Sequence, residues 1–108
     1  MPKRTPSVLI VGAGSIGSAY GAVFARLHSQ GLLKLSMKAT PRHLAALAKG
    51  IEMVDPDGKV LIEAEAGFLV SDNWKDLSGR CYDYIVDATT VGALTADDLG
   101  RMAAISIC

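Results

Sequence analysis

Three glycines near the start of the chain have the spacing that lets a backbone turn approach a phosphate group closely. The motif Gly12-x-Gly14-x-x-Gly17 follows directly on the apolar run 8–11 and precedes a stretch of helix-forming residues. In such a strand, turn and helix, the first glycine permits the turn and the second admits a pyrophosphate. The third lets the helix pack closely on the strand. A helix N-terminus also favours negative charge. The segment therefore predicts a dinucleotide-binding turn.

The same segment allows two other interpretations, because 18 consecutive positions from Val8 to Ala25 carry no charge. This length is about the minimum that spans a bilayer, and Gly17 and Gly21 have the spacing of helix contacts in lipid. Lys3 and Arg4 before an apolar run also resemble the start of a secretory signal. Neither interpretation explains where the glycines lie. We therefore expect a soluble, cytoplasmic chain with no membrane partner.

Basic residues stand where folds of this kind select their cofactor. An acidic residue about 20 positions beyond the glycines would bind the ribose 2′-hydroxyl of NAD, whereas a basic one accommodates the 2′-phosphate of NADP. Lys38 occupies that place and Arg42 follows in the next expected helix, with no acid before Glu52. The pattern favours NADP(H), although both side chains could instead be solvated surface residues.

A third group of candidate residues follows a later apolar strand. Ligands of open α/β sheets lie outside the carboxyl ends of the strands, which places Thr89 and Thr90 near the cofactor. Asp87 either faces the cofactor or caps the following turn, and Trp74 is expected to be a packing or lid residue. The residues predicted to bind the cofactor are Gly12, Ala13, Gly14, Ser15, Ile16, Gly17, Lys38, Arg42, Thr89 and Thr90.

Composition and charge limit the function classes. The chain has 108 residues, half of them hydrophobic, which fits one folded α/β domain over residues 1–108. Its net charge is zero, but the first 51 residues hold seven bases and no acids. The bases are scattered, which favours an anionic ligand over nucleic acid.

The cysteines and histidines give no sign of a metal or redox site. Cys81 and Cys108 form no metal or redox motif. We therefore expect Cys81 to be a small buried apolar residue, Cys108 to be a chain end and the compartment to be reducing. His28 and His43 lie 15 residues apart with no Cys, Asp or Glu between them, and no metal site is predicted.

Apolar runs and turn residues predict a Rossmann-type, doubly wound α/β fold with a mostly parallel sheet and an inserted β-hairpin. Thr40 and Thr95 are expected N-caps, and Gly31 and Gly50 are expected stops. The expected elements are a strand at 7–11, a helix at 15–28, a strand at 32–37, a helix at 42–49, a hairpin turning at 55–58, a short strand at 67–70, a polar connection or helical turn at 71–80, a buried parallel strand at 82–89, a helix at 96–102 and a truncated strand at 103–108.

Two stretches resemble the ketopantoate reductases (2-dehydropantoate 2-reductases). The first is GAGSIGSAYGAVFA, in which an Ile-Gly-Ser and a Tyr-Gly continue the glycine motif. The second is RHLAALAKGIEMVDPDGKV, with a basic residue, a His-Leu-x-x-Leu helix, a Gly-Ile and an Asp-Gly hairpin tip. The resemblance implies hydride transfer from NADPH to a 2-keto acid in pantothenate biosynthesis.

Two departures from that family leave catalysis unassigned. The family's catalytic lysine would fall just after the strand at 82–89, where this chain reads Asp87-Ala88-Thr89-Thr90-Val91. The family's C-terminal helical domain is also expected to be absent, because the sequence ends at Cys108. We therefore expect an NADP(H)-binding domain whose catalytic residues are unknown and whose substrate would be a small 2-keto acid if a second domain is supplied. The alternative is a non-catalytic dinucleotide-sensing or interaction module. Self-association into a homo-oligomer stays open.

Overall fold

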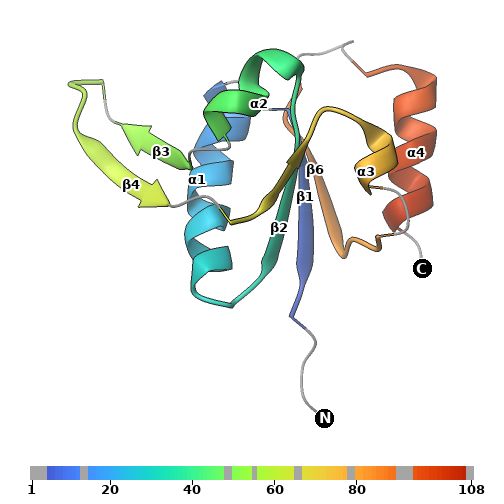
Figure 1. The fold of residues 1–108 in the computed structure, drawn as a ribbon, viewed down its shortest axis with the longest axis horizontal. Coiled ribbons are helices and arrows are strands. Elements are labelled where there is room, and N and C mark those ends of the chain that lie inside the picture. The colour runs from blue at the N-terminus through green and yellow to red at the C-terminus, as the bar shows by residue number, and fades with distance from the viewer. Residues whose placement is uncertain are drawn as a thin grey trace.

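The chain folds around one parallel sheet, with a separate two-stranded hairpin beside it (Figure 1). The computed structural model describes residues 5–12, 15–47, 50–54, 56–64, 67–77, 80–89 and 94–106. Its elements are β1 (Ser7–Val11), α1 (Ser15–Ser29), β2 (Lys34–Lys38), α2 (Pro41–Leu47), β3 (Ile51–Val54), β4 (Val60–Ala64), β5 (Leu69–Ser71), α3 (Trp74–Leu77), β6 (Tyr84–Asp87) and α4 (Ala96–Ser106). This arrangement confirms the expected Rossmann-like α/β fold.

The order of the strands creates a switch point in the sheet. The four strands lie in the order β5-β2-β1-β6, and every neighbouring pair is parallel. From β1 the chain winds outward through β2 to β5, then returns to place β6 on the other side of β1. Open α/β sheets bind ligands outside the carboxyl ends of their strands at such a reversal. The fold therefore directs attention to the ends of β1 and β6.

Strand β1 is buried on both faces because its side chains alternate between two hydrophobic clusters. Val8 and Ile10 pack in the cluster that includes Ala22 and Ala25 of α1. Leu9 and Val11 pack in the second cluster, which holds Leu77 of α3 and Ile105 of α4. Helices therefore cover both faces of the sheet, as the doubly wound prediction requires.

The end of α1 explains why β2 begins later than its apolar run suggests. Gly31 has a φ of 76°, and its N–H donates to the carbonyl of His28 at 3.0 Å. The N–H of Leu32 donates to the carbonyl of Leu27 at 3.0 Å, which completes a Schellman motif. Leu32 thus belongs to the helix end and is exposed. The strand occupies 34–38 rather than the predicted 32–37.

The hairpin forms where it was expected and packs on α1 rather than on the sheet edge. Strands β3 and β4 pair antiparallel, and Gly58 at the tip has a φ of 85°. Figure 1 shows the hairpin lying beside α1, and Ile51 of β3 joins the cluster on that helix face. The predicted insertion is therefore confirmed.

Three expectations were wrong. Strand β6 is parallel but not buried: among the described residues it pairs with β1 alone, and Tyr84 is 65% exposed. The stretch 103–106 continues α4 instead of starting a strand, since its apolar Ile105 turns inward onto the second cluster at helical spacing. Cys81 is exposed and disulfide-bonded rather than a buried apolar residue. Sequence spacing does not reveal such a bond, because the fold decides which cysteines come within bonding distance. Cys108 lies outside the described residues.

His28 takes part in a hydrogen bond between a helix and the sheet. His28 accepts a hydrogen bond from the N–H of Leu35 at Nδ1, 3.0 Å away, and ties α1 to β2. Within the described ranges, no group of three potential metal ligands is found. The same ranges contain no helix with the length and hydropathy needed to cross a bilayer.

Candidate functional site

Three strands end together at the carboxyl edge of the sheet. Val11, the last residue of β1, lies opposite Lys38 of β2 on one side and Asp87 of β6 on the other. The N–H of Gly12 donates to the carbonyl of Lys38, and the N–H of Ala88 donates to the carbonyl of Val11, both at 2.8 Å. The first residue of the glycine motif, the basic residue at the end of β2 and the residue that follows β6 therefore all lie at one edge of the sheet.

Gly12 has the conformation that the glycine motif requires. Its φ is 108°, a value that side chains of L-residues rarely allow. A Cβ on this residue would also lie 2.9 Å from the carbonyl oxygen of Ala88 and 3.1 Å from the amide nitrogen of Thr89. The turn after β1 therefore needs glycine for two separate reasons.

The first turn of α1 contains Ser15, Ile16 and Gly17, so the helix begins three residues after Gly12. Its first N–H groups lack partners within the helix, and the first turn carries no acidic residue. The helix dipole adds positive potential at this end. The arrangement suits a phosphate group. Ala13 and Gly14 lie outside the described residues.

Asp87 takes the simpler of its two expected roles. Its Oδ1 accepts hydrogen bonds from the N–H of Thr89 at 2.9 Å and from the hydroxyl of Thr89 at 2.6 Å. Asp87 therefore caps the turn that follows β6 and fixes Thr89 at the carboxyl edge. Thr90 lies outside the described residues.

Lys38 ends β2 with its ammonium group on an aromatic face. Its Nζ lies 5.0 Å from the ring centroid of Trp74, the first residue of α3. A cation over an indole ring at this distance is attracted by the negative face of the ring. Arg42, the other basic candidate, is the second residue of α2.

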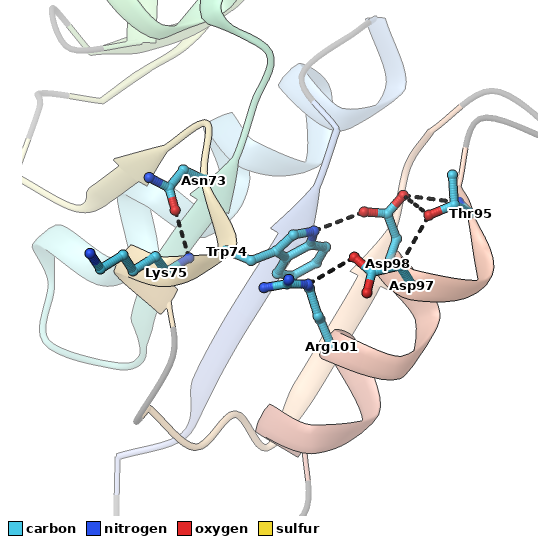
Figure 2. Close-up of polar contacts among 7 residues, drawn as sticks. All are labelled: Asn73, Trp74, Lys75, Thr95, Asp97, Asp98 and Arg101. Atoms are coloured by element: carbon cyan, nitrogen blue, oxygen red, sulfur yellow. Dashed lines mark hydrogen bonds and ion pairs between the residues drawn. The ribbon is translucent and has the colours of Figure 1, made fainter.

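Trp74 is itself anchored by the N-terminus of α4 (Figure 2). Its Nε1–H donates to Oδ1 of Asp98 at 2.8 Å, while Oδ2 of Asp98 accepts from the N–H and hydroxyl of Thr95. The hydroxyl of Thr95 in turn accepts from the N–H of Asp98, forming the expected N-cap. The pKa of Asp98 is lowered, chiefly by the Thr95 N–H, then by Trp74 and the Thr95 hydroxyl, with a smaller Coulombic effect of Lys38.

The sequence did not reveal the contacts among Lys38, Trp74 and Asp98. These residues are far apart along the chain, and the packing of α3 and α4 on the sheet brings them together. The one hint is that the chain's single tryptophan lies in an otherwise polar connection. Trp74 was expected to be a packing or lid residue, and it does pack against the cluster around Leu77 and Ile105.

Comparisons with known proteins find one informative structural relative. Neither protein-family models nor curated proteins match the chain. Among solved structures, it is similar to 2-dehydropantoate 2-reductase from Porphyromonas gingivalis W83, with a TM-score of 0.70 and 26% identity. The alignment covers 95% of this chain and 34% of that one, so the chain spans about a third of the relative's length. The similarity supports the resemblance to this family.

Proposed function

We propose that this chain is the NADP(H)-binding domain of an oxidoreductase of the ketopantoate reductase kind. The observation that carries the proposal is the position of Gly12 at the switch point, between the end of β2 and the turn after β6. Only a backbone without Cβ fits there, and the positive end of α1 begins three residues later. Dinucleotide-binding folds place the pyrophosphate at such a glycine turn and helix N-terminus, which supports the proposal.

Different residues at the carboxyl edge bind different parts of the cofactor in this proposal. The first turn of α1 and the glycine turn hold the pyrophosphate. Lys38 and Arg42 hold the 2′-phosphate through charge-assisted hydrogen bonds, and Thr89, fixed by Asp87, faces the part of the cofactor nearest β6. When bound, the nicotinamide supplies the hydride chemistry.

The activity proposed for the whole enzyme is reduction of a 2-keto acid such as ketopantoate. It rests on the resemblance and on the structural relative, of which this chain covers 34%. We propose that a further domain supplies the substrate contacts and the catalytic side chain. No residue of the present domain is assigned a catalytic role.

Calorimetric titration with NADPH and NADH tests the cofactor. A hydrogen bond to a charged group contributes about 1.5–3 kcal/mol, so one or two contacts to the 2′-phosphate should favour NADPH roughly ten- to several-hundred-fold. The double variant Lys38→Ala/Arg42→Ala should lose that preference while its NADH affinity stays nearly unchanged. Added salt should also reduce the preference, because the phosphate is partly open to solvent.

A matched control separates local contacts from net charge. Lys34 starts β2 and Arg80 precedes β6, so both lie at the opposite, amino edge of the sheet. The variant Lys34→Ala/Arg80→Ala removes the same charge and should retain the NADPH preference. Equal losses in the two double variants would refute specific phosphate contacts. NADPH binding without NADPH oxidation in the presence of ketopantoate, even in a longer form of the protein, would favour the sensing alternative.

A further inference from the structure

Trp74 stands between the proposed phosphate-binding lysine and an acidic helix cap. The Nζ of Lys38 lies over one face of its ring, 5.0 Å from the centroid, and its indole N–H points along the ring edge to Asp98. The ring also packs on the hydrophobic cluster that α3 and α4 form with β1. Contacts at its face, edge and body therefore hold the indole in one orientation.

One oxygen of the Asp98 carboxylate accepts a hydrogen bond from the indole N–H, and the other accepts hydrogen bonds from Thr95. Two hydrogen bonds from Thr95 and one from Trp74 converge on its carboxylate (Figure 2). Thr95, the N-cap of α4, thus holds the carboxylate of Asp98 in place, and this carboxylate in turn holds the indole ring of Trp74. Lys38 lies against the ring face, and its charge makes only the smallest contribution to the lowered pKa of Asp98.

We infer that Trp74, anchored by Asp98, is a positioning residue that holds Lys38 at the carboxyl edge and thereby sets the preference for NADPH over NADH. A lysine side chain has three flexible donors on a long stem and loses much conformational freedom when it binds an anion. Contact with a fixed aromatic face removes part of that freedom before the cofactor arrives. Preorganisation of this kind raises affinity without adding a contact to the ligand. The inference rests on the proposed function, because it needs a 2′-phosphate at this edge.

The main test measures NADPH and NADH affinity by calorimetry in four proteins: the unmodified chain, Trp74→Leu, Lys38→Ala and the double variant Trp74→Leu/Lys38→Ala. Trp74→Leu should weaken NADPH binding about two- to tenfold, the range expected from losing a cation–π contact. NADH binding should stay within about twofold. In the Lys38→Ala background the tryptophan substitution should cause no further loss of NADPH affinity, because a positioning residue acts through its lysine.

Four further variants separate positioning from general support of the fold. Trp74→Phe keeps an aromatic face and should restore part of the NADPH preference, even if Trp74→Leu folds poorly. Asp98→Asn keeps an oxygen acceptor for the indole and should retain more of the preference than Asp98→Ala. Lys75→Ala removes the adjacent exposed cation and serves as the matched control, with an expected unchanged ratio of the two affinities.

Fluorescence gives an independent readout, because Trp74 is the only tryptophan in the chain. A 2′-phosphate bound by Lys38 adds negative charge beside the ring, so the emission of Trp74 should change more with adenosine 2′,5′-bisphosphate than with adenosine 5′-monophosphate. An unchanged NADPH-to-NADH ratio in Trp74→Leu would overturn the inference and leave the proposed function intact. Equal weakening of both cofactors would also overturn it, since the ring would then contact adenine or support the fold. Failure of the unmodified chain to bind either cofactor would overturn the proposed function together with the inference.

Discussion

The carbonyl oxygen of Ala88 occupies the space that any side chain on Gly12 would need. An ideal Cβ on Gly12 would come within 2.9 Å of that oxygen, and the obstacle is backbone, which cannot rotate away as a flexible side chain can. The two residues follow β1 and β6, on either side of the switch point. Their contact therefore fixes how closely these strand ends approach one another.

Gly12→Ala should destabilise the fold more than alanine at another glycine with positive φ. Strained backbone of this kind costs about 1–3 kcal/mol, and the overlap with Ala88 adds to it. Gly58→Ala is the control, because Gly58 has a φ of 85° but nothing within 4 Å of the position that a methyl group would occupy. Urea unfolding of both variants measures the difference. Equal losses of unfolding free energy in the two variants would show that the overlap with Ala88 does not contribute to the destabilisation.

Two helical glycines should respond in different ways to alanine. Gly100 in α4 has open space around its Cβ position, so Gly100→Ala should raise the unfolding free energy by about 0.5–1 kcal/mol through better helix propensity. At Gly21 in α1, a Cβ would lie 2.8 Å from Cδ1 of Ile51 and 3.1 Å from Sδ of Met37. Gly21→Ala should therefore stabilise less than Gly100→Ala.

The larger variant Gly21→Val sharpens this comparison. It should cost about 1–3 kcal/mol, because the added methyl groups must displace the hairpin from α1. Thermal unfolding monitored by circular dichroism measures the stability of the variants at both sites. A stabilised Gly21→Val protein would contradict the close packing of the hairpin against the helix.

The parts of the fold that were predicted correctly are those determined by local chemistry. Strand β1 matches its expected range because an apolar run ends at a glycine turn. Thr95 caps α4 and Gly31 ends α1, since caps depend on a few neighbouring residues. The parts that were wrong depend on tertiary position. The apolar run in β6 predicted a buried strand, but the strand order places β6 at an edge.

The candidate site was predicted in outline but not in its connections. The first residue of the glycine motif and the basic residue Lys38 at the end of β2 lie at one edge of the sheet, because parallel strands bring their carboxyl ends together. The contact of Lys38 with Trp74 depends on where α3 packs, which no spacing in the sequence encodes. Which of the expected residues bind a cofactor stays a prediction.

Asp87 should stabilise the turn after β6 through its oxygen rather than its charge. Asp87→Ala removes the acceptor of both bonds from Thr89 and should lower the unfolding free energy by about 0.5–1.5 kcal/mol. Asp87→Asn keeps a side-chain oxygen and should lose less. Urea unfolding at neutral pH compares the two variants. If asparagine were as damaging as alanine, the carboxylate charge, and not the hydrogen-bonded turn, would be the important feature.

Asp98 should make the stability of the protein depend on pH in the acidic range. Its pKa is lowered in the folded chain because Thr95 and Trp74 donate hydrogen bonds to the carboxylate. A carboxyl group with a lowered folded-state pKa stabilises the fold above its unfolded pKa, and this contribution disappears as the pH falls through the folded value. The loss should therefore develop below about pH 4, the ordinary range of an aspartate.

The variant Asp98→Asn should show a shallower fall in unfolding free energy over that acidic range than the unmodified protein. Asp97→Asn is the control, because Asp97 is the neighbouring carboxylate and contacts Arg101 at 2.9 Å on the exposed side of α4. Urea unfolding at a series of pH values, followed by the emission of Trp74, reports both the stability and the environment of the indole that Asp98 binds. A slope unaltered by Asp98→Asn but reduced by Asp97→Asn would mean that the ion pair of α4, and not the bonds around Asp98, controls the acid sensitivity.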